Sequence, residues 1–324
     1  MARRYVVTGA SGFLGQHLVR SLRADGQDVL PVVRAPGPSD AFGARTLDDV
    51  WATPSLLDGA DALVHAAAIR HRFGVSREAY AQSNVGTTAR LLETARGRVQ
   101  RFVYVSSVGV YGFPENLPIT EGHPFTPRTL YSETKVEAER TVRAACERGL
   151  LATVIVRPTI VYGSGDRNGM MDKMARMIKS GTYAIVGDGE NVLHHTHVDD
   201  IVMGTKLACD RPEASGEDFI LCGPETITLR RLSELTARAL GRRLLRVRIP
   251  LRLARAVATL IDRTGPIVPP SLRREPPINN EKLDVMTRAV SFNCDKARRL
   301  LGFSPVVGYE EGIRRTFATS LRRE

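Results

Sequence analysis

The sequence predicts an α/β protein built on a doubly wound parallel sheet, with a smaller α+β lobe in the C-terminal part of the chain. Three observations favour this fold class. Short apolar runs typical of strands alternate with segments of helical periodicity through the first half of the 324 residues. One of these runs, residues 101–107, is apolar along most of its length, as expected for a strand that is covered on both faces. The chain also opens with a strand, a glycine-rich turn and a helix in direct succession.

The glycine-rich turn follows the first predicted strand, residues 5–7, and precedes a helix predicted for residues 16–22. Gly9 allows a tight turn, Gly12 lets backbone N–H groups approach a pyrophosphate, and Gly15 lets the helix pack closely on the strand. The helix N-terminus adds unpaired N–H groups and a partial positive charge. The turn therefore favours a dinucleotide cofactor over the alternative of an ordinary strand–helix turn. Three further residues of this turn, Ser11, Phe13 and Leu14, are candidate cofactor contacts as well.

The second predicted strand, residues 28–33, ends at Arg34. In a dinucleotide fold the end of this strand meets the adenosine ribose. An acidic residue there would bind the 2′-hydroxyl of NAD, whereas an arginine can pair with the 2′-phosphate of NADP. Arg34 therefore favours NADP over NAD, and the alternative is an ordinary exposed arginine. A loop over residues 36–44 and a short third strand then lead to Asp48, the next candidate cofactor residue.

The fourth and sixth predicted strands also end in residues suited to a cofactor. The strand at 61–68 ends in three alanines, whose small side chains let a planar ring system lie close to the backbone. A helix is predicted for residues 76–96, and a sixth strand at 152–156 leads into a proline. The candidate cofactor contacts in this part of the chain are Ala66, Ala67, Ala68, Asn84 and Pro158.

The strand at 101–107 ends in Ser107, and a helix that begins near residue 129 carries Tyr131 and Lys135 four residues apart, on one face. A free tyrosine has a pKa of about 10 and is a poor base at neutral pH. A neighbouring ammonium group would lower this pKa, so we expect Lys135 to activate Tyr131 and also to bind the nicotinamide ribose. Ser107 would hold the substrate oxygen. The three residues are candidates for catalysing hydride transfer between a nicotinamide and a secondary carbinol carbon, with Tyr131 transferring the proton. Tyr131 and Lys135 are also candidate cofactor contacts.

The sequence resembles an extended short-chain dehydrogenase/reductase of the NAD-dependent epimerase/dehydratase family, because seven of its segments match motifs of that family in the same order along the chain. The resemblance implies a Rossmann-like domain of about seven strands over residues 1–163, with a returning segment at about 192–223. It also implies a substrate-binding lobe formed by residues 164–191 and 224–324, the roles given above for Ser107, Tyr131 and Lys135, and a homodimer. The segments are Thr8–Gly15, His65–Ala68, Asn84–Thr87, Ser106–Gly112, Tyr131–Lys135, Arg157–Gly163 and His197–Asp200.

Departures from the family pattern narrow the expected chemistry. Dehydratases of this family carry an acidic pair after the strand-five serine or threonine, where Val108 and Gly109 stand here. Nucleotide-sugar epimerases usually have an asparagine in place of Ile160 and an arginine in place of Leu193. The sequence is closest to the 3β-hydroxysteroid dehydrogenase and dihydroflavonol reductase branch, which implies a bulky, apolar, steroid-, terpenoid- or flavonoid-like substrate. A nucleotide-sugar 4-epimerase or ketoreductase is the alternative, and a cofactor-sensing protein without turnover is a third.

The net charge of +11 comes from the C-terminal part of the chain. Residues 230–324 hold 21 Lys and Arg against 9 Asp and Glu, but no aromatic residues alternate with them and no DNA-binding motif is present. We expect solvated faces rather than a nucleic-acid partner, with an anionic substrate or membrane surface as the alternative. No apolar run approaches a membrane span, no signal peptide is evident, and the four scattered cysteines are typical of reduced thiols in a cytoplasmic protein.

Three features of the C-terminal half have competing interpretations. The helix predicted at 251–261 is amphipathic and suits packing within the lobe, an apolar pocket or a membrane surface. The methionine-rich helix at 170–179 suits packing against the sheet domain better than a pocket. The histidines at 194, 195 and 197 invite a zinc hypothesis, but no cysteine or further histidine stands at ligand spacing, so we expect no metal. The apolar face at 251–261 holds Leu253, Ala256, Val257, Leu260 and Ile261.

Overall fold

The computed structural model describes residues 2–35, 43–70, 73–167, 169–245, 247–264, 275–276 and 278–318. The predicted loop at 36–44 and the Pro/Gly-rich segment predicted at 265–277 lie almost wholly outside these residues. The last part of the helix predicted to end at residue 321 lies outside them as well.

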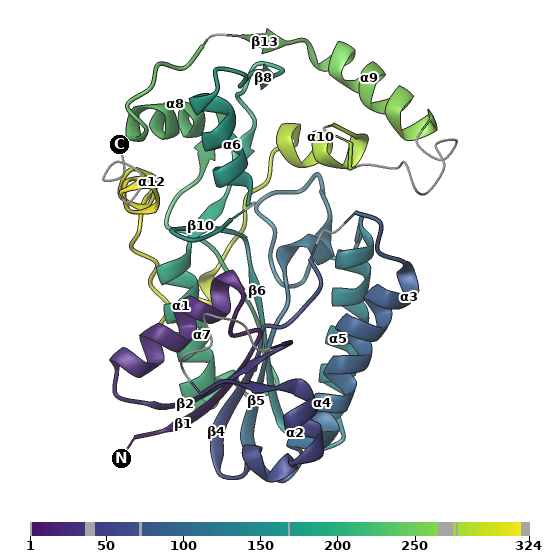
Figure 1. Cartoon of the computed structure of the whole chain (residues 1–324), viewed down its shortest axis with the longest axis vertical. Helices are drawn as coiled ribbons and strands as arrows, with labels where there is room; N and C mark the ends of the chain where they lie inside the picture. The colour runs from purple at the N-terminus through teal and green to yellow at the C-terminus, as the bar shows by residue number, and fades with distance from the viewer. Residues whose placement is uncertain are drawn as a thin grey trace.

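A parallel sheet of seven strands forms the centre of the molecule (Figure 1). Its order is β11-β6-β5-β4-β1-β2-β3, and every pairing in it is parallel. The predicted doubly wound α/β fold and its strand number are therefore confirmed. The strands are β1 (Arg4–Thr8), β2 (Asp28–Val33), β3 (Arg45–Thr46), β4 (Ala60–His65), β5 (Val99–Val105), β6 (Ala152–Pro158) and β11 (Asp218–Leu221).

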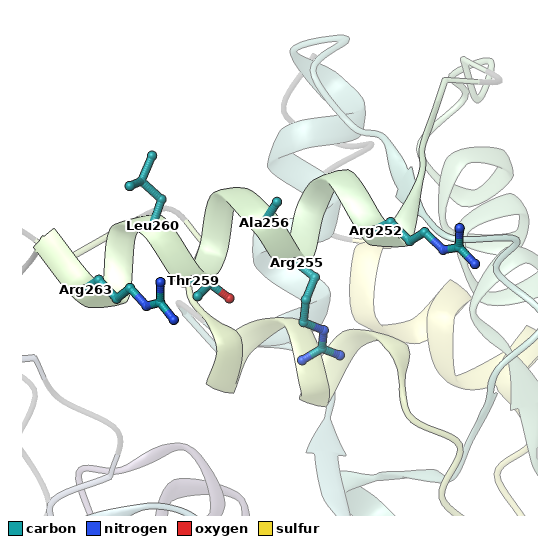
Figure 2. Close-up of a pocket in the computed structure, with 6 residues that line it drawn as sticks. All are labelled: Arg252, Arg255, Ala256, Thr259, Leu260 and Arg263. Carbon is teal, nitrogen blue, oxygen red and sulfur yellow. The ribbon is translucent and has the colours of Figure 1, made fainter.

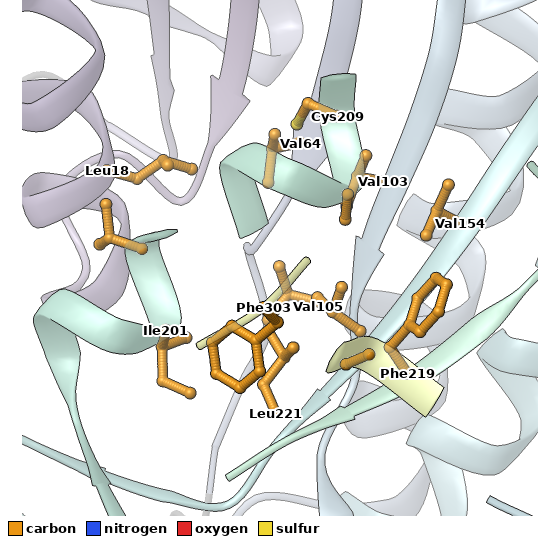
Figure 3. Close-up of a cluster of buried hydrophobic side chains, with 14 of the residues drawn as sticks. Leu18, Val64, Val103, Val105, Val154, Ile201, Cys209, Phe219, Leu221 and Phe303 are labelled. Atoms are coloured by element: carbon orange, nitrogen blue, oxygen red, sulfur yellow. The ribbon is translucent and has the colours of Figure 1, made fainter. Parts of the chain in front are cut away.

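Helices cover both faces of this sheet. Successive strand residues point to opposite faces, so Val103 enters one apolar cluster and Phe102 the other. Figure 3 shows the first cluster, where Leu18 from α1 and Ile201 from α7 meet valines of three strands. On the other face α4 and α5 pack together over the sheet. These helices are α1 (Phe13–Ala24), α7 (Val198–Asp210), α4 (Thr87–Ala95) and α5 (Leu130–Glu147), with α2 (Leu47–Ala52) and a 3₁₀ helix at Pro54–Leu57 beside β3 and β4.

The helix predicted for residues 76–96 is present but is not regular. It begins with α3 (Arg77–Tyr80), which Ser76 caps by accepting a hydrogen bond from the Ala79 N–H. A π-helix then spans Ala81–Gly86 before α4 begins. π-helical turns inside α-helices are rare and often occur at functional sites. Here the turn contains Asn84, one of the predicted cofactor residues.

A second group of elements lies beyond the carboxyl ends of the strands, at the top of Figure 1. Its apolar cluster contains Met171 and Met174, which pack with α8 and α12 residues rather than against the sheet, so the predicted packing of these methionines is wrong. Helices already cover both faces of the sheet, so the second group of elements packs at the carboxyl ends of the strands instead. The elements are β8 (Ile185–Val186), β9 (Val192–Leu193), β12 (Ile227–Thr228), β13 (Arg248–Ile249), α6 (Met170–Lys179), α8 (Leu229–Ala239), α9 (Leu251–Thr264), α10 (Asn280–Thr287) and α12 (Tyr309–Phe317).

The chain crosses between the two groups several times. A short parallel pair, β7 (Ile160–Tyr162) and β10 (His195–His197), connects them. Helix α11 (Asp295–Leu301) returns to the sheet and packs on β11 and α7. In the described part of the chain, no helix is long and apolar enough to cross a membrane. Two further 3₁₀ helices lie at Val108–Tyr111 and Pro212–Ala214.

Candidate active site

The glycine turn after β1 is packed so closely on neighbouring backbone that side chains at Gly9 and Gly15 would not fit. Gly9 adopts φ of 71°, and a Cβ atom there would lie 2.7 Å from the backbone nitrogen of Ala67. A Cβ on Gly15 would lie 2.1 Å from the carbonyl oxygen of Gly9. Helix α1 begins at Phe13 with Gly12 as its N-cap and no capping side chain. The first-turn N–H groups therefore remain available for an anion, and the residues present fit a dinucleotide diphosphate.

The predicted adenosine-binding residues follow the two strands beside β1. The N–H of Ala10, in the glycine turn, donates to the carbonyl of Val32 at 3.2 Å, which places the end of β2 beside the turn. Arg34 lies two residues further on and is exposed. Asp48 is also exposed, in the first turn of α2 after β3. Their contacts with a cofactor stay predictions.

A buried histidine joins β1, β4 and α4 beneath the glycine turn. The Thr88 hydroxyl donates to the Asn84 carbonyl at 2.6 Å, so it accepts from His65 Nε2 at 3.0 Å. The other ring nitrogen, Nδ1, then accepts from the Thr8 hydroxyl at 2.7 Å. Burial, with a smaller contribution from the charge of Lys135, lowers the pKa of His65 to about 3. His65 is therefore a neutral positioning residue, which the sequence showed only as part of a motif.

Asn84, a predicted cofactor residue, is buried and hydrogen-bonded within the protein. The amide is 1% exposed. Its oxygen accepts from the Ile69 N–H at 2.8 Å, and its nitrogen donates to the Ile69 carbonyl at 3.1 Å and to Thr134 at 3.0 Å. Asn84 thus holds the segment that follows the alanines against α5. Its contact with a cofactor stays a prediction.

The alanines themselves, Ala66 to Ala68, are only partly buried, which leaves a surface of small side chains beside the glycine turn. Pro158 closes β6 and is buried. Whether these residues touch a cofactor stays a prediction.

The three predicted catalytic residues meet at the carboxyl end of β5. Thr129 caps α5 in a reciprocal arrangement with Ser132, which fixes the start of the helix one residue before Tyr131. Lys135, 2% exposed, donates from Nζ to the carbonyl of Val105 at 2.6 Å. Its Nζ lies 5.8 Å from the centroid of the Tyr131 ring. Ser107 follows β5 directly and is hydrogen-bonded to the Tyr131 hydroxyl.

The pKa of Tyr131 differs from the expectation. Burial raises it to about 12, and the charge of Arg70 and the hydrogen bond from Ser107 only partly oppose this. The prediction that Lys135 lowers the pKa is wrong for this structure, because the ammonium is directed to the Val105 carbonyl rather than to the phenol. Burial also lowers the pKa of Lys135 to about 7, against the charge of Glu139. At neutral pH the Tyr131 phenol is therefore protonated.

Two residues of this site were not predicted. Arg70, in the loop after β4, is the cation that most lowers the pKa of Tyr131. Its Nη2 lies 3.9 Å from Oδ1 of Asp166, a buried carboxyl group in the loop after β7. Burial raises the pKa of Asp166. Neither residue belongs to a motif, and the only signal was that each follows a strand whose carboxyl end faces this edge of the sheet.

Behind the site, Arg157 forms a buried network. Its guanidinium donates to Glu139 at 2.9 and 2.6 Å and to the Tyr111 hydroxyl at 2.5 Å, and it also pairs with Asp218. Arg157 is fully buried, so this network is structural and ties β6 to α5 and β11.

The three neighbouring histidines, His194, His195 and His197, are buried. His194 accepts from the Phe292 N–H at 3.1 Å through Nδ1, and its Nε2 bonds to the Gly223 carbonyl at 3.0 Å. Both of its ring nitrogens are therefore used. His195 and His197 lie buried in β10. Among the residues that the structure describes, no group of three or more His, Cys, Asp or Glu side chains is placed to bind a metal ion.

Comparisons with known proteins agree with this geometry. The NAD-dependent epimerase/dehydratase family model matches residues 5–222. A 2-alkyl-3-oxoalkanoate reductase of Stenotrophomonas maltophilia is 30% identical over 98% of this chain and 99% of its own length. A 3β-hydroxysteroid dehydrogenase/Δ5→4-isomerase of Mycobacterium tuberculosis is 32% identical over 96% of this chain and 88% of its own. The structure of MoeE5 with UDP-glucose and NAD matches with a TM-score of 0.77, 25% identity and 99% coverage of both chains.

Proposed function

The chain belongs to the NAD-dependent epimerase/dehydratase family, and from this premise we propose that it is an NAD(P)-dependent oxidoreductase acting on a bulky, largely apolar substrate without a nucleotide. It would transfer a hydride between the nicotinamide and a secondary alcohol or ketone. The observation that carries the proposal is the meeting of Ser107, Tyr131 and Lys135 at the end of β5. In the sheet β5 neighbours β4, which precedes the alanines, and β4 neighbours β1, which precedes the open glycine turn.

In reduction, a ketone oxygen would accept hydrogen bonds from Ser107 and Tyr131. Tyr131, protonated at neutral pH, would give its proton to that oxygen as the carbonyl carbon is reduced. When bound, the dinucleotide supplies the hydride, and its oxidised ring carries a positive charge that favours the phenolate in the reverse direction. Lys135, held by the Val105 carbonyl, would bind the nicotinamide ribose. The segment at 9–15 would hold the diphosphate through backbone N–H groups.

Three residues support a substrate that is neither a nucleotide sugar nor one that loses water. Leu193, where epimerases usually have an arginine, is 1% exposed and packs in the apolar cluster of the second group. Ile160 is part of β7. Val108, where dehydratases carry an acid, is buried. The two relatives named above act, by their names, on an alkyl-oxoalkanoate and a steroid. We propose that the substrate-binding lobe expected from the sequence, residues 164–191 and 224–324, holds the substrate.

The main test is a spectrophotometric assay of NADPH and NADH oxidation with steroid, terpenoid and flavonoid ketones and with UDP- and dTDP-sugars. We expect turnover with apolar ketones. Tyr131→Phe should lower kcat at least about a hundredfold, since it removes the acid, while the cofactor dissociation constant stays unchanged. Turnover with the sugars alone would overturn the substrate assignment, and an unchanged rate in Tyr131→Phe would remove this residue from the mechanism.

The alternative, a nucleotide-sugar 4-epimerase or ketoreductase, is supported by the likeness to the UDP-glucose complex of MoeE5 and by the basic C-terminal part of the chain. An epimerase regenerates its cofactor and should retain NAD(H) through purification. Mass spectrometry of the purified protein separates the two, since tightly held NAD(H) together with sugar turnover would favour the alternative.

We further propose that the preferred cofactor is NADP. Arg34 supports this, because it is exposed at the end of β2, beside the glycine turn, where a 2′-phosphate would lie. Loss of a charged hydrogen bond costs about 1.5–3 kcal/mol, so Arg34→Ala should raise KM for NADPH at least about tenfold and leave KM for NADH unchanged. A cytoplasmic homodimer is also proposed, and the four free cysteines are in keeping with a reducing compartment.

A further inference from the structure

The exposed apolar side chains of this protein are concentrated in one segment. Eleven large apolar residues are exposed in the part of the chain that the structure describes, and six of them lie between residues 245 and 260. Scattered single leucines on a surface are ordinary, but a contiguous set marks an interaction surface. We call this set the α9 patch. It consists of Leu245, Val247, Leu251, Leu253, Val257 and Leu260, with exposures of 52, 50, 39, 58, 43 and 62%.

The patch is exposed because α9 rests on its neighbours through small and polar side chains. Only Ala254 and Ala258 of this helix are buried, in a small cluster with Leu283 of α10. Arg255 pairs with Asp284 of α10 at 2.9 Å. Figure 2 shows Arg255 and Thr259 directed toward α10, whereas Ala256 and Leu260 point away from it. Leu260 therefore lies on the face that the rest of the described chain leaves uncovered. Leu253 and Val257, seven and three residues before it, share that face of the helix.

Positive charge surrounds this apolar face. Residues 242–263 contain seven arginines and a single acidic residue, Asp262. That carboxylate is already engaged, since it accepts from the backbone and side-chain N–H groups of Asn280 at 3.0 and 2.8 Å. Exposed leucines flanked by arginines on one helix are the pattern of helices that lie in a membrane interface. The exposed arginines around the patch are Arg242, Arg243, Arg248, Arg252 and Arg263.

We propose that the α9 patch binds the surface of an anionic phospholipid bilayer. The leucines would enter the boundary between headgroups and acyl chains, and the arginines would contact lipid phosphates. The charge argues against a second copy as the occupant, because a symmetric contact would place two such arginine-rich segments against each other. The inference rests on the proposed function in one respect: a bilayer is where an apolar substrate would be concentrated.

The test is co-sedimentation of the full-length protein with vesicles of phosphatidylcholine alone or mixed with phosphatidylglycerol. We expect binding to the mixed vesicles, weakened by added salt. The double variant Leu253→Glu/Leu260→Glu should abolish it. Arg252→Gln/Arg263→Gln should weaken it at least about fivefold, since each arginine near such a surface contributes a comparable factor. The matched control Val306→Glu changes a residue that is 75% exposed outside the patch and should bind as the wild type does.

Equal binding to both vesicle types, no binding, or unchanged binding in the leucine variant would overturn the proposal. A change of oligomeric state in that variant, measured by light scattering, would overturn it in favour of a second copy. Capture of an acidic protein through the patch, with no vesicle binding, would overturn it in favour of a protein partner. Vesicle binding is measured without cofactor or substrate, so it is independent of turnover. Failure of the wild-type protein to reduce any ketone would contradict the proposed function instead.

Discussion

Two buried cations lie close together in this molecule and have opposite surroundings. Arg157 is bonded to two carboxylates and a tyrosine hydroxyl, and although burial acts against its charge, Glu139 in particular raises its pKa above the usual value. Lys135 makes no ion pair with any residue that the structure describes, bonds to one backbone carbonyl, and has a pKa lowered to about 7. A buried charge left without a partner costs stability. The difference is in keeping with the catalytic role that we propose for Lys135 and with a structural role for Arg157.

Replacing Lys135 by methionine should have the largest effect on activity. The substitution keeps the length of the side chain and removes the group that we propose binds the nicotinamide ribose. We expect kcat/KM for a ketone to fall by about two to four orders of magnitude, while the melting temperature stays equal or rises, because a desolvated amine is removed. Steady-state kinetics and calorimetry check this. A folded variant with wild-type kinetics would contradict the contrast between the two cations.

Replacing Arg157 by leucine should have the largest effect on stability. It leaves the fully buried Glu139 without its close counter-ion, and breaking a buried pair in this way costs about 3–5 kcal/mol. Asp218 keeps Arg143 at 3.2 Å and Lys296 at 3.5 Å, so the loss comes mainly from Glu139. Urea unfolding measures the loss. The double variant Arg157→Leu/Glu139→Leu should recover part of it, and kcat per folded molecule should change little. If instead activity collapsed and stability did not, the assignment of the two roles would be reversed.

The pKa of Lys135 predicts a pH dependence that Arg157 does not share. The lysine titrates near 10.5 in the unfolded chain and near 7 in the folded protein. Between these values the unfolded chain binds the proton and the folded one does not, so stability falls as the pH falls from about 10 to 7. Lys135→Met lacks this dependence. The variant should gain stability over the wild type as the pH falls through that window, by on the order of 5 kcal/mol in full, and parallel melting curves would contradict the shift.

The smallest effect should come from Tyr111→Phe. This substitution removes one hydrogen bond to the Arg157 guanidinium and leaves both carboxylates in place. We expect a loss of about 1–2 kcal/mol in urea unfolding and wild-type kinetics. A loss as large as that of Arg157→Leu would mean that the hydroxyl, rather than the carboxylates, keeps the arginine buried.

The sequence predicted the sheet and the place of the three candidate catalytic residues, because these follow from local patterns. Gly9, Gly12 and Gly15 are spaced as the turn requires, and Tyr131 and Lys135 share a helix face. It could not predict properties that depend on contacts between distant segments. The pKa of Tyr131 rises because its surroundings are buried, and Arg70 and Asp166 meet only because two loops end at one edge of the sheet.

The remaining differences have the same origin. The periodicity at 76–96 indicates a helix. The π-helical turn depends on the hydrogen bonds that Asn84 makes with Ile69 and Thr134, which are distant in the sequence. We expected the methionine-rich helix α6 to pack against the sheet, because the sequence of an apolar helix face does not show which element the face contacts. Its partner is α8, whose place is fixed by tertiary packing.

The return of the chain to the sheet through β11 decides how this protein can be recombined with its relatives. Leu221 and Phe303 come from distant parts of the chain, yet a Cβ on Gly204 would touch both, at 2.8 and 3.0 Å (Figure 3). A protein truncated before residue 218 would lose the edge strand β11. The backbone N–H and C=O groups of β6 would then be exposed and could pair with another molecule. A chimera designed to change specificity must therefore exchange two separate gene segments, and must retain β11 and the stretch around Phe303 from the recipient.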